Sequence, residues 1–417
     1  MEPEPLVKVR FRGRIRTADP NEPLSHALGK DPFSILQRSI RYHRPRAPFC
    51  GVGYCTQCLV RVNDAPNVRS CRYLPKEGDV IETENAWPRP GLDLLGALDW
   101  IFPRGIDTVH GFRRPAFLTP LYHRVVRRLA GYGELPRHAP ERPPSSVGPP
   151  TPTDVLVVGA GRAGRAAAER LEEHGVSTIV IERERAALPP ASLRGVHART
   201  TAVFLSRRSV GERSSFGAIV VPEGRPALAI TARSVILSPG GYDASLFFAG
   251  NDRPGVVVAD QAERAAPVAG PRPFRRALLF GGGPRAAEML RRFGESVEAV
   301  ASFGAIDPEV TLRASELGIP LYPRTILLRA DGRARVRSVR LRSRGGETTF
   351  SLSVDAVVLA HRRLPNAQLF FQLGARMHWE PSIGHYLPDL TDTLETTVPG
   401  LFAAGEAAGF PPDGTAA

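Results

Sequence analysis

Short runs of alternating apolar and polar residues mark the N-terminal part of the chain. Residues 6–17 alternate apolar and charged positions around Gly13, which predicts a two-stranded hairpin half-buried on one face. Residues 23–40 have helical spacing, interrupted near residues 29–32. Residues 58–63 and 78–83 are further predicted strands. Together these elements predict a small domain, residues 1–88, in which a sheet packs around a helix.

The second half of the chain has a different pattern, in which apolar strands run into glycine-rich turns and then helices. This pattern is typical of parallel α/β folds. Two such units begin at Asp154 and at Arg276. Further strands of the same units are predicted at 177–181, 297–303 and 354–360.

The stretch between these two parts is less regular. Leu92 to Phe102 and Leu121 to Leu129 have the spacing of short amphipathic helices, and neither could bury its apolar face alone. We therefore expect them to pack on a neighbouring domain or subunit. Residues 136–152 are rich in Pro, Ser, Arg and Gly, which predicts an extended linker.

All four cysteines of the chain lie within one stretch of the first domain. Cys50, Cys55, Cys58 and Cys71 are spaced C-x4-C-x2-C-x12-C, and the first three match the plant-type spacing of a [2Fe-2S] cluster. Gly51 and Gly53 suit a tight loop whose backbone approaches the sulfurs. We therefore predict four thiolate ligands to a [2Fe-2S] cluster in a β-grasp, ferredoxin-like domain.

Zinc and disulfides are the alternatives for these cysteines. Structural zinc usually takes two C-x2-C pairs, and only Cys55 and Cys58 form one. Two disulfides need an oxidising compartment, and no apolar signal segment is found at the N-terminus. His43, Arg44 and Arg46 precede the cluster, where they could raise its potential, dock a partner or form surface ion pairs.

The unit at Asp154 carries a dinucleotide-binding motif. Gly159, Gly161 and Gly164 form G-x-G-x-x-G between a strand and a helix, a turn that lets a pyrophosphate approach the helix N-terminus. Glu182 follows the next strand, where it would accept hydrogen bonds from the ribose hydroxyls. We also assign cofactor contacts to the motif neighbours Ala160 and Ala163 and to Arg183.

Two later motifs extend this prediction. Thr397 to Gly409 resembles the late motif of two-dinucleotide-binding-domain flavoproteins, with Gly405 and Glu406 at the positions that face FAD; the usual Asp is replaced by Glu406. The unit at Arg276 carries G-x-G-x-x-A at Gly281, Gly283 and Ala286, but no acid follows its next strand. NAD is an option at this second site, and a scaffold without a nucleotide is favoured. No cysteine remains for a redox-active dithiol.

Composition excludes several other classes of function. The formal charge of +13 comes almost entirely from scattered arginines, and no nucleic-acid-binding motif is found, so nucleic acid is not an expected partner. No apolar run reaches the length of a membrane span. We expect a cytoplasmic protein that is peripheral to the inner membrane through partners at most. No acid/base pair or nucleophile stands out, so we assign no catalytic residue.

The motifs together resemble sarcosine oxidase alpha subunits and their [2Fe-2S]-bearing relatives. The resemblance rests on R-Y-H-R-P-R-A-P-F-C-G-V-G-Y-C-T-Q-C, P-N-V-R-S-C-R and E-T-E-N-A-W-P in the first domain, and on G-A-G-R-A-G, R-T-T-A-V, G-N-D-R-P-G-V and V-P-G-L-F-A-A-G-E later. The family includes subunits of hydrogen cyanide synthase, opine oxidases and dye-linked proline or hydroxyproline dehydrogenases. It implies an electron-transfer subunit with FAD and a [2Fe-2S] cluster, beside a D-amino-acid-oxidase-like flavoprotein subunit and further small subunits.

The chain differs from that family in two places. The segment between Glu182 and Arg199 is short and lacks the P-G-G-x motif that wraps the flavin, and the chain ends at Ala417, where relatives continue into a helix over the isoalloxazine. Both differences predict a more exposed flavin and weaker FAD binding. Two alternatives follow: an NAD(P)H-dependent flavin/iron-sulfur reductase, and a docking subunit that retains only the cluster.

The expected architecture is therefore a multidomain α/β and α+β protein with an abbreviated two-dinucleotide-binding-domain (Rossmann-like) flavoprotein fold. Its expected domains are 1–88 for the cluster, 89–152 for the connecting helices and linker, 153–271 and 366–417 for FAD, and 272–365 for the inserted NAD(P)-binding-like domain.

Overall fold

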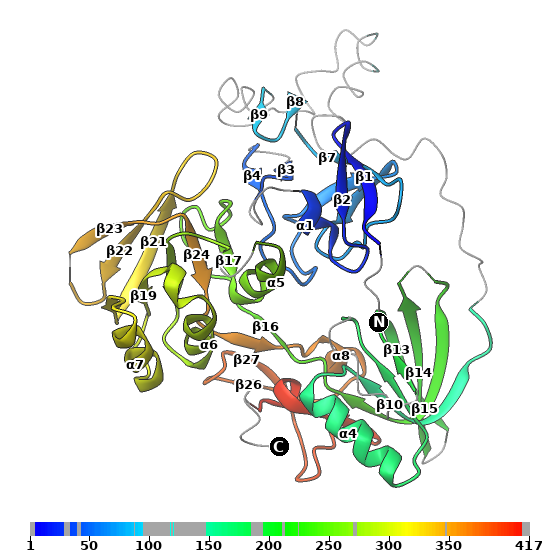
Figure 1. The fold of residues 1–417 in the computed structure, drawn as a ribbon. Helices are drawn as coiled ribbons and strands as arrows, with labels where there is room; N and C mark the ends of the chain where they lie inside the picture. Colours follow the sequence, from blue (N-terminus) through cyan, green and yellow to red (C-terminus); the bar gives the residue numbers. More distant parts are fainter. Residues whose placement is uncertain are drawn as a thin grey trace. The chain divides into compact units, whose positions relative to one another are not determined.

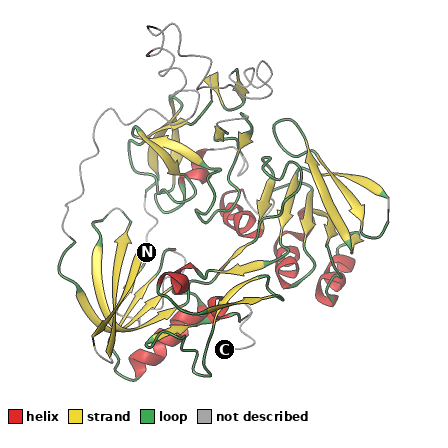
Figure 2. Cartoon of the chain, turned by 180° about the vertical axis from the view of Figure 1, so that it is seen from behind, coloured by secondary structure: helices red, strands yellow, loops and turns green. Residues whose placement is uncertain are grey.

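The computed structural model describes residues 5–410 except 29–33, 40–42, 87, 95–116, 118–119, 121–146, 185–194, 211–212, 224, 270–272 and 347. The chain forms two compact units (Figure 1). Unit 1 comprises Met1–Pro140 and Asp243–Arg362, and unit 2 comprises Glu141–Tyr242 and Arg363–Ala417. Seen from behind, the helices appear as short segments beside the sheets (Figure 2).

The N-terminal part of unit 1 is a five-stranded sheet in the order β2-β1-β7-β5-β6. Its strands are β1 (Val7–Phe11), β2 (Arg14–Ala18), β5 (Leu59–Val62), β6 (Ala65–Arg69) and β7 (Val80–Thr83). Apolar side chains on one face of the sheet pack on α1 (Leu24–Leu28), and this core also holds Cys58 and Cys71. The predicted hairpin and the predicted strands at 58–63 and 78–83 are confirmed.

Two local expectations for this region differ from the structure. Of the helix predicted over residues 23–40, the described residues include the helix α1, but Gln37–Arg38 form a short strand, β3, paired with β4 (Pro45–Arg46). Leu92–Asp93 form strand β9, paired with β8 (Pro88–Arg89), at the position of a predicted helix start. The rest of that helix, and the whole of Leu121 to Leu129, lie outside the described residues.

The second part of unit 1 is a parallel sheet in the order β17-β24-β18-β19-β20. The strands are β17 (Val256–Val258), β18 (Ala277–Phe280), β19 (Val297–Ala301), β20 (Leu321–Tyr322) and β24 (Ala356–Leu359). Helices α5 (Ala259–Ala269), α6 (Pro284–Phe293) and α7 (Pro308–Glu316) contribute to its core. An antiparallel sheet of β21 (Thr325–Asp331), β22 (Ser338–Ser343) and β23 (Thr349–Ser353) adds to this region.

The inserted domain therefore starts earlier than the sequence pattern indicates. Strand β17 pairs in the parallel sheet of unit 1, and helix α5 packs in the core of that sheet. We expected residues 153–271 to form the first part of the FAD domain. The three valines of β17 are fully buried, with Val257 in the core beside the helices and Val256 and Val258 in the core on the other face of the sheet. So short a strand, with no glycine-rich turn after it, gives little sign in the sequence of the sheet to which it belongs.

Unit 2 contains the sheet β12-β11-β10-β15-β14-β13, with β28 also paired to β15. Its strands are β10 (Thr151–Val158), β11 (Thr178–Ile181), β12 (Val196–His197), β13 (Thr200–Val210), β14 (Arg213–Pro222), β15 (Leu228–Leu237) and β28 (Leu401–Ala403). Strand β10 begins inside the predicted linker, because Thr151 and Pro152 already pair with β15. Helix α4 (Arg162–Glu173) follows β10, as the dinucleotide motif predicts. Helix α8 (Gln368–Gln372) and the hairpin of β26 (Met377–Glu380) and β27 (His385–Pro388) complete the unit.

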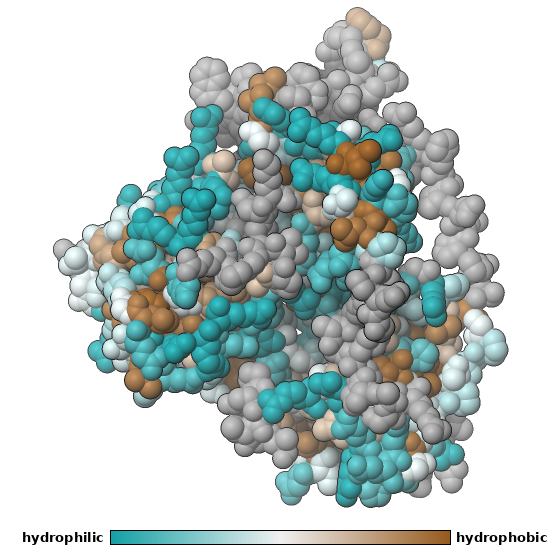
Figure 3. Space-filling model, in the orientation of Figure 1, coloured by the Kyte–Doolittle hydropathy of each residue, from teal (hydrophilic) through white to brown (hydrophobic). Residues whose placement is uncertain are grey.

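The surface is mainly polar. In the space-filling view, hydrophilic residues predominate among those described, and hydrophobic ones form small groups (Figure 3). In the described part of the chain, no helix combines the length and the apolar character needed to cross a bilayer.

Candidate functional site

The cysteine loop of the first domain turns tightly through two glycines. Gly51 and Gly53 have φ values of +67° and +81°, a region that glycine adopts without strain. The loop brings the backbone N–H of Cys55 to 3.4 Å from Cys50 Sγ. Cys71 arrives just after strand β6, as expected for a fourth ligand from outside the loop.

The four sulfurs are linked in a chain of contacts, from Cys55 to Cys50, from Cys50 to Cys71 and from Cys71 to Cys58. Hydrogen bonds from the Cys55 and Cys71 thiols lower the pKa of Cys50 to about 2, and the same contacts raise the pKa values of Cys55 and Cys71. The Cys71 thiol also lowers the pKa of Cys58. These contacts link all four predicted ligands into one group, and Cys55 is the member with appreciable exposure to solvent.

The group consists of four thiols without a carboxylate. A [2Fe-2S] cluster distributes its four thiolates over two irons. A structural zinc site usually takes its ligands from two C-x2-C pairs, and this chain has one such pair. The donor set and its spacing therefore suit iron–sulfur ligation.

Two buried polar residues support the loop, and the sequence did not single them out. Gln37 of β3 donates from Nε2 to the carbonyl of Thr56, at 2.5 Å, between the second and third cysteines. Ser70 donates its hydroxyl to the carbonyl of Cys58, at 2.7 Å. Both side chains are almost fully buried, which is costly unless they are hydrogen-bonded. They fix the loop backbone from which the cysteines project.

The arginines before the cluster form ion pairs. Arg44 and Arg46 approach Asp252 Oδ2 to 3.3 and 3.0 Å within unit 1. Arg44 is exposed, and Arg46 and Asp252 are largely covered. Ion pairing was one of the roles that the sequence left open for them.

In unit 2, the first glycine-rich loop has the geometry of a dinucleotide cradle. A methyl group on Gly159 would lie 2.2 Å from the Ser238 carbonyl oxygen, and one on Gly164 would lie 1.9 Å from that of Gly159. Both glycines are therefore required by close packing. Gly161, in contrast, faces open space at the start of α4. An open position at a helix N-terminus is where a pyrophosphate would lie.

Glu182 lies beside this loop at the end of β11. Its Oε2 accepts a hydrogen bond from the Ala160 N–H, at 2.7 Å, and its Oε1 accepts one from the Glu184 N–H, at 2.6 Å. The carboxylate is thus held against the motif, and its contact with a ribose stays a prediction. Arg183, also predicted to contact the cofactor, forms an ion pair with Glu184 at 3.3 Å.

The late motif meets the early one. Gly405 has a φ of +67°, and a methyl group there would lie 3.0 Å from the Ala163 Cβ. It opens the 3-10 turn η3 (Gly405–Ala408), which follows β28. Hence the two predicted halves of the FAD site, far apart in the sequence, adjoin in unit 2.

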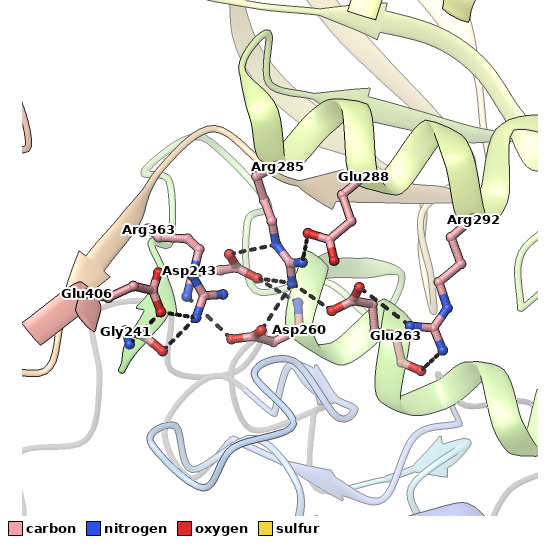
Figure 4. A network of polar contacts seen from close by, with 9 residues as sticks. All are labelled: Gly241, Asp243, Asp260, Glu263, Arg285, Glu288, Arg292, Arg363 and Glu406. Carbon is pink, nitrogen blue, oxygen red and sulfur yellow. Dashed lines mark hydrogen bonds and ion pairs between the residues drawn. The ribbon is translucent and has the colours of Figure 1, made fainter. Parts of the chain in front are cut away.

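Glu406 is engaged by an arginine that the sequence did not single out. Arg363, at the start of β25 (Arg363–Pro365), donates from Nε to Glu406 Oε1 at 2.6 Å, and the Gly241 N–H donates to Oε2 at 3.0 Å (Figure 4). Arg363 also donates to the Gly241 carbonyl at 2.8 Å. Arg363 and the Gly241 N–H therefore fix the orientation of the Glu406 side chain.

The second glycine-rich loop, in unit 1, is less suited to a nucleotide. Ser302, where an acid would hold the ribose, bonds instead to the backbone of Gly304 and Ala305. Asp307 Oδ2 would lie 3.7 Å from a methyl group on Gly283. A carboxylate at this position opposes the approach of a phosphate. The fold of this loop is as predicted, but its polar groups do not fit a pyrophosphate.

A buried charge network adjoins the start of α6. The Arg285 guanidinium points among four carboxylates, with contacts of 3.2 Å to Asp243, 3.1 Å to Asp260, 2.8 Å to Glu263 and 2.6 Å to Glu288 (Figure 4). Burial disfavours its charge, but these carboxylates outweigh burial and raise the pKa of Arg285. The network joins Asp243, at the end of β16 (Gly241–Asp243), to α5 and α6.

Comparisons with known proteins agree with both sites. Residues 4–86 match the family model described as 2Fe-2S iron-sulfur cluster binding domain, and residues 153–417 match the model described as pyridine nucleotide-disulphide oxidoreductase. A curated relative is sarcosine oxidase subunit alpha of Rhizobium meliloti (strain 1021), 26% identical over 95% of this chain. The match spans 43% of that relative, so the chain corresponds to less than half of its length.

One solved structure shares the fold over nearly the whole chain. The L-proline dehydrogenase from P. horikoshii covers 98% of this chain with a TM-score of 0.63 and 20% identity, and the match covers 70% of that protein. The thioredoxin reductase of T. acidophilum covers 61% of this chain at a TM-score of 0.49 and 17% identity, over 90% of its own length. The expected order of domains, a cluster domain followed by a Rossmann-like fold, is confirmed. The chain belongs to the pyridine nucleotide-disulphide oxidoreductase family, with a 2Fe-2S iron-sulfur cluster binding domain at its N-terminus.

Proposed function

We propose that this chain is the electron-transfer subunit of a heteromeric oxidoreductase that acts on an amine or amino acid. The observation that carries the proposal is the presence in one chain of four converging cysteines and an open dinucleotide cradle at Gly161. With FAD at one site and a [2Fe-2S] cluster at the other, the chain can pass electrons from one redox group to the next. The absence of an assigned acid/base pair agrees with substrate oxidation in another subunit.

The substrate class comes from the relatives. One is named for sarcosine and the other for L-proline, and both compounds are secondary amines with a carboxylate. We infer a secondary amino acid, or an opine, as the donor. The partner is a flavoprotein of the D-amino-acid-oxidase type, in whose active site the C–N bond is oxidised, and further small subunits complete the assembly.

The residues of this chain position the cofactors. Cys50, Cys55, Cys58 and Cys71 would ligate the two irons of the cluster. Glu182 and the Gly159–Gly164 loop would bind the adenosine and pyrophosphate of FAD, with Glu406 and Gly405 toward the flavin side. Bound FAD supplies acceptance of two electrons and their release one at a time to a one-electron carrier.

Iron, acid-labile sulfide and flavin analyses of the anaerobically purified chain test this proposal. We expect two irons and one FAD per chain, with the iron lost and the flavin retained in Cys58→Ser. Co-expression with a D-amino-acid-oxidase-like chain should give a complex that reduces the cluster when sarcosine or proline is added. Iron without flavin would contradict the relay and favour a docking subunit.

The reductase alternative has its own test. An NAD(P)H-dependent enzyme would reduce its flavin on addition of NADH without any partner. We expect no such bleaching, because Asp307 lies beside the second loop and Ser302 is bound to backbone groups. Loss of flavin absorbance with NADH alone would contradict the proposed function and favour an NAD(P)H-dependent reductase.

A further inference from the structure

The cysteine loop packs against helix α5 of the second part of unit 1. A methyl group placed on Gly51 would lie 2.8 Å from Gln261 Oε1 and 2.8 Å from Arg264 Cδ. The neighbouring carbonyl of Phe49 accepts a hydrogen bond from the Val258 N–H, at 3.3 Å, just before α5 begins. The loop that carries the predicted ligands is therefore in direct contact with a helix that packs on the parallel sheet of unit 1.

This contact is buried. Cys50 and Val52 are each 7% exposed and belong to a hydrophobic core with Val256 and Val258 of β17. The Gln261 side chain is 2% exposed, although it is polar. A buried amide is costly unless it is hydrogen-bonded, and the Gln261 amide lies with its oxygen toward Gly51 of the loop.

Arg264 places a positive charge at the same contact. Its charge also reaches α1 of the first domain, where it adds to burial in lowering the pKa of His26 to about 4. Arg264 of α5 thus brings a cation to the backbone of the loop at Gly51, next to the first ligand, Cys50.

We propose that Gln261 and Arg264 are positioning residues for the loop that holds the [2Fe-2S] cluster, and that the charge of Arg264 raises the reduction potential of the cluster. The inference rests on the proposed function, since it requires the cluster. On reduction, the cluster gains one electron from a chemical or flavin donor and becomes more negative by one charge. A nearby cation stabilises that added charge, and local charge is a recognised means of tuning iron–sulfur potentials.

Potentiometric titration of the purified chain, followed by absorption and EPR, tests this proposal. Arg264→Gln should shift the potential to a more negative value. A tenfold lower ratio of reduced to oxidised cluster at a fixed potential, equal to about 59 mV for one electron, is the expected size. Arg264→Lys keeps the positive charge, so its potential should stay close to that of the unsubstituted chain. Arg313→Gln on α7 removes the same charge from another helix of unit 1 and should shift nothing.

The outcomes separate this inference from the proposed function. A full cluster whose potential is unchanged in Arg264→Gln overturns the inference alone, and so does an equal shift in Arg313→Gln. Absence of iron from the unsubstituted chain overturns the proposed function as well. If Arg264→Gln loses iron while Arg264→Lys keeps it, the charge at this position is needed to hold the cluster, which supports the positioning role.

Discussion

Arg363 and Glu406 form a two-point ion pair within unit 2, with Arg363 Nε 2.6 Å from Glu406 Oε1 and Nη2 3.2 Å from Oε2. Both side chains are about four-fifths buried. Because the late motif aims Glu406 at the predicted flavin site, the pair also sets the charge that this site presents to FAD.

Arg363→Gln should therefore destabilise unit 2 and weaken flavin binding. Charge-assisted hydrogen bonds of this kind contribute roughly 1.5–3 kcal/mol, and partial exposure places the expected loss near the lower end. Arg376→Gln is the matched control, because Arg376 pairs with Asp389 in the same unit but is mostly exposed. Arg376→Gln should lower the free energy of unfolding by less than about 1 kcal/mol. Urea unfolding followed by circular dichroism compares the two, and equal losses would contradict the assigned role of the Arg363 pair.

Gly161→Ala should lower flavin content without destabilising the fold. Gly161 has an extended backbone that alanine can adopt, and a methyl group there would enter open space where the pyrophosphate is expected. Gly283→Ala in the second loop is the control, since its methyl group would make only an ordinary contact with Asp307. We expect bound FAD to fall at least tenfold in the first variant and to stay unchanged in the second. A Gly161→Ala chain with full flavin would place the cofactor elsewhere.

The local motifs were predictable from the sequence because each is fixed by neighbours in the chain. The cysteine spacing, the glycines and Glu182 all act within one loop or one strand–turn–helix unit. The turn into β6 was missed: Asn63 and Asp64, both at positive φ, form a tight turn that pairs β5 with β6 despite Pro66. Gln261, Arg264 and Arg363 were also missed, because their roles depend on contacts with residues far away in the chain. No periodicity of a helix or strand reports such contacts.

Arg285→Gln should cost more stability than the loss of a surface arginine. Asp243 is 1% exposed, so removing the guanidinium leaves a buried carboxylate without its cation. Breaking a buried pair in this way typically costs about 3–5 kcal/mol. The control is Arg276→Gln, which opens an exposed pair with Glu298 and should cost about 0–1 kcal/mol. Thermal unfolding measures both, and a double variant that adds Asp243→Asn should recover part of the loss.

Stability should fall as the pH drops below about 6.5. Burial, assisted by Arg362, lowers the pKa of His361 to about 4, and burial together with Arg264 does the same for His26. Between pH 6.5 and 4 the unfolded chain binds protons that the folded chain does not, so the free energy of unfolding decreases as pH falls. Above pH 6.5 both states are neutral at these histidines and the effect vanishes. Each contributes up to about 3 kcal/mol, at about 1.4 kcal/mol per pKa unit.

Unfolding midpoints measured from pH 7.5 to 4.5 should show this fall, and His361→Gln should flatten it. His26→Gln should flatten the remaining slope, because His26 is the second histidine whose pKa is lowered by burial. A slope that is identical in His361→Gln and the unsubstituted chain would mean that His361 is protonated in the folded state.

Gly51→Ala and Gly13→Ala form a pair that separates backbone strain from the α5 contact. Both glycines have positive φ, +67° and +77°, so alanine costs each about 1–2 kcal/mol. A methyl group on Gly13 meets nothing within 4 Å, whereas one on Gly51 meets Gln261 and Arg264. Because strain is common to both, any additional effect in Gly51→Ala comes from separating the cysteine loop from α5. We expect that variant to lose iron and to expose the amides of the loop to hydrogen exchange. Gly13→Ala should keep its cluster, and iron loss of the same size in both variants would assign the effect to strain alone.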